Sequence, residues 1–318
     1  MQKKTLFLLI KLALSVALIV WITYEIPLDS VFEVMASVNP VLLGLALSLY
    51  FIGYLITALR WRTLIRVQGG DAPILFLVRS FLVALFFNNF LPSTVGGDVV
   101  RMYDSWRLGN TKSDAVTVIL VDRLLGVTVL LCFALIALAF DQRVMNQVPY
   151  IVVWVVVGLG SIGVGAWLTL KIPASRAETL GLASTGLGRR VAGILVKVLR
   201  SFQAYRNAKP AVLRAFALSV LLQVNVVLHF VVLARAIGIS VPVESMFLMI
   251  PVAILIMMLP VSINAIGVRE TVFVFLFSLY GVGSVEALAF AWMAYALALS
   301  QGLLGGVVFA LRRERRTA

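Results

Sequence analysis

The sequence predicts an all-α polytopic membrane protein with about six full transmembrane helices and two re-entrant helical hairpins in an inverted repeat. Of its 318 residues, 62% are hydrophobic and only 13% are charged, and the mean hydropathy is +1.05. Soluble domains are about half apolar and one quarter charged, so this chain requires lipid as its solvent. Because a transmembrane helix takes about 20 apolar residues, we expect one membrane domain, residues 1–318, without a sizeable soluble part.

Six hydrophobic stretches are long enough to predict full crossings. They lie near residues 5–24, 41–59, 115–140, 150–170, 212–236 and 286–311. Two further apolar segments are interrupted. The first runs from about residue 73 to residue 91 and ends in Pro92-Ser93-Thr94-Val95-Gly96-Gly97, and the second, from about 245 to 280, is interrupted at Pro260, Asn264 and Gly267.

The distribution of lysine and arginine predicts the orientation, since positively charged loops stay in the cytoplasm. Most of the 27 basic residues lie near the N-terminus, in segments 60–71, 98–114 and 171–210, and in the tail from Arg312. Segment 24–40 has no basic residue and segment 141–149 has one. We therefore expect cytoplasmic N- and C-termini, and two interrupted segments that enter and leave the membrane from opposite faces.

The two breaks resemble each other, because Leu91 to Arg101 and Leu259 to Arg269 both start with Leu-Pro and end with an arginine ten positions after the leucine. Each break stands between full crossings, which is typical of an inverted repeat with a binding site near the midplane. We assign the repeats to about 41–140 and 212–311, joined by a cytoplasmic amphipathic linker, 171–210. Re-entrant backbone is tolerated only inside protein or beside a watery cavity, so a cavity is expected.

The residue types at the breaks suggest recognition of an anion. Proline ends a helix and glycine lets the chain reverse, while a helix N-terminus and an arginine both attract phosphate. Asp98 and Glu270 are predicted as counter-ions of Arg101 and Arg269, with proton transfer as an alternative. The predicted substrate site comprises Asn88, Asn89, Pro92, Ser93, Thr94, Gly96, Gly97, Asp98, Arg101, Asp122, Arg123, Pro260, Asn264, Gly267, Arg269 and Glu270.

Alternative roles remain open for several of these residues. Arg101 is equally compatible with an interfacial charge or a buried ion pair, whereas an arginine as deep as Arg269 favours a functional role. Asp122 and Arg123 are neighbours in a predicted helix, so their side chains should face separate partners. Gln223, Asn225 and His229 favour hydrogen bonds between helices, and the small residues Gly302, Gly305 and Gly306 favour close helix packing.

Other functional classes are disfavoured by composition. Cys132 and His229 are the only cysteine and histidine, so we expect no disulfide, catalytic triad, metal site or cofactor. An intramembrane transferase acting on a lipid-linked phosphate or sugar, with Asp98 and Asp104 as metal ligands, is an alternative, although the sequence contains no acidic cluster. A third possibility is an accessory subunit that does not transport.

The net charge of +13 does not require nucleic acid. The positive loops explain it, together with an amphipathic pattern near 187–202 that predicts a helix bound to anionic lipid headgroups at the cytoplasmic face.

Three strings, in this order, carry a family resemblance: residues 87–101 (Phe87-Asn88-Asn89 through Gly96-Gly97-Asp98 to Arg101), residues 122–126 (Asp122-Arg123-Leu124-Leu125-Gly126) and residues 259–270 (Leu259-Pro260 through Asn264 to Arg269-Glu270). The chain resembles the flippase-like membrane domain of bacterial lysylphosphatidylglycerol synthases. It departs from the expected pattern at Asp122, where Glu is expected, and at Asn264-Ala265, where Gly is expected.

The resemblance implies lipid translocation across the bacterial inner membrane. It implies no synthesis, because no aminoacyl-transferase domain follows Arg316. A membrane lipid is the implied substrate, and an envelope lipid-synthesis enzyme is a possible partner.

Overall fold

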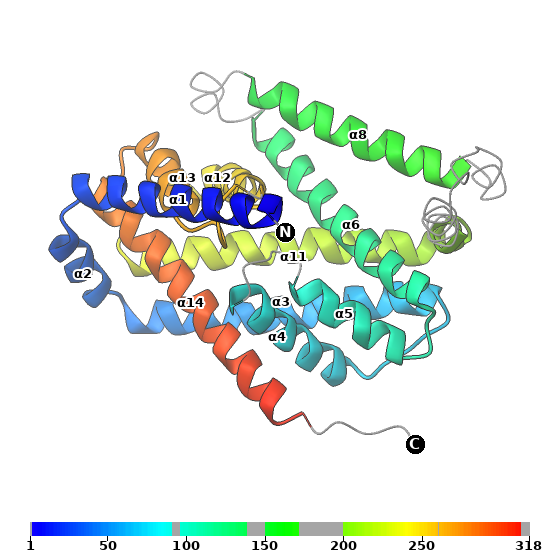
Figure 1. Cartoon of the computed structure of the whole chain (residues 1–318). Helices are drawn as coiled ribbons and strands as arrows, with labels where there is room; N and C mark the ends of the chain where they lie inside the picture. Colours follow the sequence, from blue (N-terminus) through cyan, green and yellow to red (C-terminus); the bar gives the residue numbers. More distant parts are fainter. Residues whose placement is uncertain (1, 91–95, 139–149, 172–199, 260, 313–318) are drawn as a thin grey trace.

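The computed structural model describes residues 2–90, 96–138, 150–171, 200–259 and 261–312. Within these ranges all regular secondary structure is helical (Figure 1). The named helices are α1 Gln2–Glu25, α2 Leu28–Ala36, α3 Pro40–Val67, α4 Ile74–Phe90, α5 Gly96–Arg107, α6 Lys112–Leu138, α8 Ile151–Lys171, α11 Lys209–Ala236, α12 Val243–Met257, α13 Val268–Ser278 and α14 Ser284–Ala310.

The long helices α3 and α11 lie side by side and form the most extensive helix pair of the fold (Figure 1). Helix α3 begins where Asn39 accepts hydrogen bonds from the N–H groups of Val41 and Leu42, at 3.0 and 3.2 Å. Such an N-cap satisfies donors that would otherwise lack a partner. The imidazole Nδ1 of His229 on α11 lies 2.9 Å from the carbonyl oxygen of Ala46 on α3, so a side chain also joins the pair.

Helix α14 crosses α4 obliquely, and small residues allow their backbones to approach (Figure 1). A Cβ atom on Gly305 would overlap the carbonyl oxygen of Leu82, and one on Gly306 would lie 2.9 Å from the ring of Phe86. Close packing through small residues is a usual means of helix association in lipid. The predicted packing role of these glycines is therefore confirmed.

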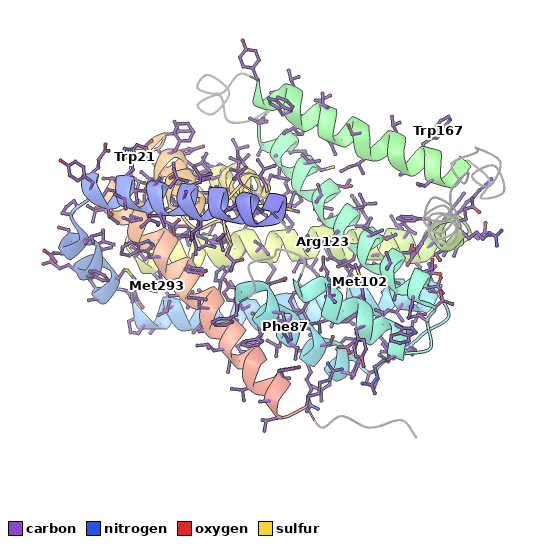
Figure 2. All side chains as sticks on the ribbon, in the orientation of Figure 1. Trp21, Phe87, Met102, Arg123, Trp167 and Met293 are labelled. Carbon is purple, nitrogen blue, oxygen red and sulfur yellow. The ribbon has the colours of Figure 1, made fainter. Side chains whose placement is uncertain are left out.

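Helix α8 stands at the margin of the molecule, against α6 (Figure 1). The indole rings of Trp21 on α1 and Trp167 on α8 are 51% and 57% exposed and lie at the outside (Figure 2). A fully buried aromatic group, Phe273, Phe277 and Phe290, packs α13 against α14. The apolar exterior is as expected for a protein whose solvent is lipid.

Within the described residues, four helices are long and apolar enough to span a membrane: α3, α6, α11 and α14. A fifth span arises if α1 and α2, which meet at a bend of 86°, count as one. Helices α4 and α12 and residues 152–167 of α8 are apolar but shorter. The prediction of an all-helical, multi-pass membrane protein is thus confirmed, while six crossings with two re-entrant hairpins remains a prediction.

Two segments that the sequence analysis placed between membrane crossings contain helices. Residues 28–36, within the predicted external segment 24–40, form α2, which buries Val31 and places the Phe32 ring 5.8 Å from that of Trp292. Residues 200–207 of the predicted linker are also helical, and the Tyr205 hydroxyl donates to the Leu64 carbonyl at 3.1 Å. Most of the predicted amphipathic helix at 187–202 lies outside the described residues.

Replacing Gly305 with Ala tests the packing of α4 against α14. We expect the free energy of unfolding in detergent to fall by about 1–3 kcal/mol, because the added methyl group must displace the backbone of α4. Gly160→Ala on α8 is the matched control, since its Cβ would meet no atom within 4 Å. Equal melting temperatures for the two variants would contradict close backbone contact at Gly305.

Candidate functional site

The first break turns the chain between the end of α4 at Phe90 and the start of α5 at Gly96. The side-chain oxygen of Asn88 accepts a hydrogen bond from the N–H of Gly97 at 2.7 Å. A Cβ atom on Gly97 would overlap the carbonyl oxygen of Ala84, so only glycine fits at this position. Pro92, Ser93 and Thr94 of the predicted site lie outside the described residues.

Helix α5 corrects the assignment of 98–114 as an ordinary cytoplasmic loop. Asp98, Arg101, Asp104 and Ser105 are all buried on it. Residues three and four apart share one face of a helix, so Asp98, Arg101 and Ser105 point in similar directions. The prediction of orientation counted the charged residues of this segment as exposed to solvent, so it did not predict that they are buried.

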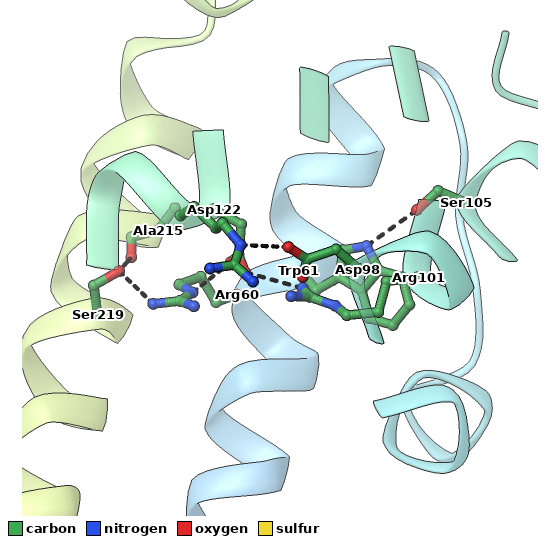
Figure 3. Close-up of polar contacts among 9 residues, drawn as sticks. Arg60, Trp61, Asp98, Arg101, Ser105, Asp122, Ala215 and Ser219 are labelled. Atoms are coloured by element: carbon green, nitrogen blue, oxygen red, sulfur yellow. Dashed lines mark hydrogen bonds and ion pairs between the residues drawn. The ribbon is translucent and has the colours of Figure 1, made fainter. Parts of the chain in front are cut away.

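Four buried charged residues, Arg60, Asp98, Arg101 and Asp122, and the exposed Arg123 form what we call the ion-pair cluster (Figure 3). The carboxylate of Asp122 lies 2.6 Å from Nε of Arg60 and 2.9 Å from Nη2 of Arg101. Arg123, the next residue, pairs with Asp98. The neighbours Asp122 and Arg123 thus face separate partners, and the cluster joins α3, α5 and α6.

The surroundings of the cluster leave little room for a ligand at Arg101. Its guanidinium carbon lies 4.6 Å from the ring centroid of Trp61, an arrangement that stabilises a cation. Trp61 in turn donates from Nε1 to the hydroxyl of Ser105 at 3.2 Å, and Arg60 donates to Ser219 on α11 at 2.9 Å (Figure 3). Of the roles left open for Arg101, the structure shows a buried ion pair.

Asp98 has a different partner from the one predicted, and Glu270 has a further partner besides its electrostatic attraction to Arg269. Asp98 pairs with Arg123 and not with Arg101, because α6 lies across α5 and presents Arg123 to it. Glu270 accepts a hydrogen bond from the N–H of Gly267 at 2.7 Å and so caps the start of α13. Asn88 fills the same role at α5. At the N-terminus of both α5 and α13, one backbone N–H group therefore already donates to a side chain. The sequence had led us to expect a phosphate group as the acceptor there.

The carboxylates required for a metal-dependent transferase are paired with arginines. Asp104 is fully buried and accepts two hydrogen bonds from Arg312, at 3.0 and 2.6 Å, and one from the hydroxyl of Ser80. Asp98 is paired with Arg123. Within the described ranges, no three His, Cys, Asp or Glu side chains form a group that can hold a metal ion.

The second break links α12, which ends at Met257, to α13, which begins at Val268. Asn264 and Ala265 have left-handed backbone conformations, with φ of 50° and 57°, and Gly267 has φ of 82°. Asn tolerates this region, and glycine adopts it freely. The chain therefore keeps a left-handed turn where the resemblance led us to expect Gly. Pro260 lies outside the described residues.

The first and second breaks meet at Asn89, Asn264 and Arg269, which we call the break junction. The side-chain amide of Asn264 donates to the backbone carbonyl of Asn89 at 2.7 Å, and Arg269 donates from Nη2 to the carbonyl of Asn264 at 2.9 Å. The Arg269 guanidinium also stacks 4.1 Å from the ring centroid of Tyr295. Its Nη1 is buried and has no hydrogen-bond partner among the described residues.

A cavity of about 260 Å³ lies between α3, α4, α11 and α14, and Asn89 of the break junction is part of its wall. Most of the wall is apolar. Its polar members are Tyr50, Tyr54, Thr57, Asn89, Asn225, His229 and Gln301. Tyr54 and Gln301 were not anticipated, because each occurs singly in a hydrophobic stretch and only the packing of four helices brings them together.

Replacing Asp122 with Asn tests whether the ion-pair cluster braces the fold. We expect the free energy of unfolding in detergent to fall by about 3–5 kcal/mol, because two buried guanidinium groups then lose their shared counter-ion. Asp71→Asn is the matched control. Asp71 is half exposed and pairs with Arg62 and Arg66, and hydrogen bonds from Arg62 and then Arg66 hold its pKa below the ordinary value.

Solvent screens such a surface pair, so the control should melt close to the wild type. If Asp122→Asn also melted close to the wild type, the ion-pair cluster would not stabilise the fold.

Comparison with known proteins identifies the chain. A relative with 29% identity over 140 residues is a UPF0104 membrane protein of Methanocaldococcus jannaschii, and the match covers 43% of this chain and 40% of that protein. The chain thus matches less than half the length of this curated relative. A family model for the lysylphosphatidylglycerol synthase TM region matches residues 8–305. The protein therefore belongs to the family of lysylphosphatidylglycerol synthase transmembrane regions.

Proposed function

We propose that this protein moves an anionic or zwitterionic phospholipid or glycophospholipid, or a lipid-linked headgroup, across the bacterial inner membrane by alternating access. The observation that supports this best is the break junction, where two interrupted segments meet beside a cavity. Interrupted helices that meet inside a membrane protein are typical of transporter binding sites. Membership of a family named for a lipid synthase supports a lipid as the substrate.

Arg269 is the residue we assign to the headgroup phosphate. Its Nη2 and one ring face are engaged, but Nη1 has no partner among the described residues. A buried charged donor without a partner is costly, so a phosphate oxygen at this position would be stabilised. Arg101 also has a buried nitrogen, Nε, without a hydrogen-bond partner among the described residues, but it forms a salt bridge with Asp122 and lies over Trp61, so we assign it to the support of the first break.

The topology we propose has six crossings, with cytoplasmic termini and two re-entrant hairpins. The hairpin of α4 and α5 enters from the cytoplasm, and that of α12 and α13 enters from the outside. The two hairpins then belong to inverted halves that rock about the break junction while the acyl chains stay in lipid. An envelope lipid-synthesis enzyme remains the proposed partner.

Cysteine labelling in intact cells tests this topology. Cys132 is the only cysteine, so Cys132→Ser gives a background without thiols. We expect cysteines introduced at Glu244 and Gly281 to react with an external, membrane-impermeant maleimide, because both positions flank the second hairpin on the outer face. A cysteine at Asp71 should react only after the membrane is permeabilised. Labelling of Glu244 and Gly281 from opposite faces would eliminate the re-entrant hairpin.

Lipid movement is tested in vesicles that contain purified protein and a fluorescent phospholipid. We expect protein-dependent movement that falls about tenfold or more in Arg269→Ala, since a charge-assisted hydrogen bond to the headgroup is lost. Asp98→Asn should also slow transport by loosening the pair with Arg123 that holds α5.

The matched control for the vesicle assay is Arg235→Ala, because Arg235 is an exposed arginine at the end of α11. It should transport at the wild-type rate. Lipid movement that is independent of protein, or equal in Arg269→Ala and the wild type, would contradict the proposal.

A further inference from the structure

The cavity between α3, α4, α11 and α14 contains buried polar atoms that lack partners. They are the hydroxyl of Tyr54, Nε2 of His229 and Oε1 of Gln301, none of which has a hydrogen-bond partner among the described residues. The three residues are 5%, 4% and 2% exposed. Buried polar groups are nearly always hydrogen-bonded in native proteins, so three such atoms around one cavity call for an occupant.

The hydrogen-bond character of these atoms can be derived from their neighbours. The carbonyl oxygen of Ala46 can only accept, so Nδ1 of His229 must donate to it. In the neutral imidazole the other ring nitrogen, Nε2, is then an acceptor. Oε1 of Gln301 is also an acceptor, while the amide nitrogen of Gln301 is directed to the hydroxyl of Ser300. The hydroxyl of Tyr54 can both donate and accept.

An occupant must therefore supply donors. A phosphate or carboxylate group offers mainly acceptors and leaves His229 and Gln301 unsatisfied. An ammonium group has donors, but none of the described residues that line the cavity is Asp, Glu, Lys or Arg, so its charge would be buried without a counter-ion. Arg269, which interacts electrostatically with Tyr50 of the cavity wall, would also repel a cation. A hydroxyl group meets every requirement.

We propose that this cavity binds an uncharged, hydroxyl-bearing group, such as a glycerol, inositol or sugar unit, through Tyr54, His229 and Gln301. The apolar wall formed by Phe81, Leu85 and Phe230 contacts the carbon face of that group. The inference rests on the proposed function for one point, that the group belongs to a lipid whose phosphate lies toward Arg269. It predicts discrimination against lipids with a cationic headgroup.

The single histidine makes binding observable without transport. The full chain, purified through a tag that lacks histidine, is labelled with nitrogen-15 histidine and placed in phosphatidylcholine bilayers. Solid-state NMR then shows one imidazole, and a donor bound at Nε2 shifts the resonance of its unprotonated nitrogen. The probes are phosphatidylglycerol, phosphatidylinositol, phosphatidic acid, phosphatidylethanolamine, free glycerol and free inositol.

We expect phosphatidylglycerol or phosphatidylinositol to shift the resonance, and phosphatidic acid and phosphatidylethanolamine to leave it unchanged. A shift with the lipids alone assigns the hydroxyl group to a lipid, whereas an equal shift with free glycerol or inositol assigns it to a soluble polyol. Both results support the chemistry of the cavity. No shift with any probe, or an equal shift with phosphatidylethanolamine, overturns it.

Variants separate binding from a change in fold. Tyr54→Phe and Gln301→Leu each remove one hydrogen-bonding group, so the lipid concentration that gives half of the shift should rise about three- to tenfold. Gln223→Leu is the matched control, because Gln223 is a buried residue of α11 with an unpartnered Nε2 but does not line the cavity. It should titrate as the wild type does. Weakening by the control equal to that by Gln301→Leu would contradict the assignment.

The result is distinguishable from a failure of the transport proposal. A shifted resonance in protein that moves no lipid in the vesicle assay would leave the cavity as a binding site without transport. Lipid movement without any shift would leave transport standing and remove the cavity from it.

Discussion

The fold depends on the pairing of buried polar groups within the protein, since the hydrocarbon core of the bilayer offers no hydrogen bonds. Asp122 is the clearest case. Its carboxylate is 2% exposed and lies between the guanidinium groups of Arg60 and Arg101, which come from α3 and α5. Through Ser219 the same network reaches α11. Four helices are thus held in register by interactions that none of them can replace with solvent.

The charged groups of the ion-pair cluster are more completely paired than the guanidinium group at the break junction. In the cluster, three guanidinium groups are compensated by two carboxylates and by the ring of Trp61. At the break junction, Arg269 has a backbone carbonyl and the ring of Tyr295 but no carboxylate within salt-bridge distance among the described residues. A cluster joined by salt bridges stabilises one structure, whereas Arg269, which Glu270 attracts without a salt bridge, can exchange partners. The salt-bridged cluster and the proposed ligand contact at Arg269 therefore lie in different parts of the chain.

The sequence predicted what depends on hydrophobicity and backbone chemistry and missed what depends on pairing. Long apolar stretches identified the four helices of the described residues that can span a membrane, and the predicted breaks indicated where α4 and α12 end. The predicted partner of Asp98 was wrong, because proximity in sequence does not determine which helix faces which. Glu270 does attract Arg269 electrostatically, but its hydrogen bond from the N–H of Gly267 was not predicted. Arg60 was missed altogether. It follows a predicted crossing and was counted as a loop charge, yet it is buried in α3.

The two proposals, for the cavity and for Arg269, together describe a headgroup with two chemically different parts. A charge buried inside a binding site needs an opposite charge beside it. The cavity is neutral and Arg269 is the cation at its edge, so the site favours a ligand whose own charge stays at that edge. A phosphate at Arg269 and an uncharged hydroxylated unit beyond it fit this division. The contact between Asn89 and Asn264 lies at the border itself, with the carbonyl of Asn264 bound to Arg269 and the side chain of Asn89 in the cavity wall. Any movement that parts the two breaks must therefore alter both halves of the site at once, which is what coupling of release to a conformational change requires.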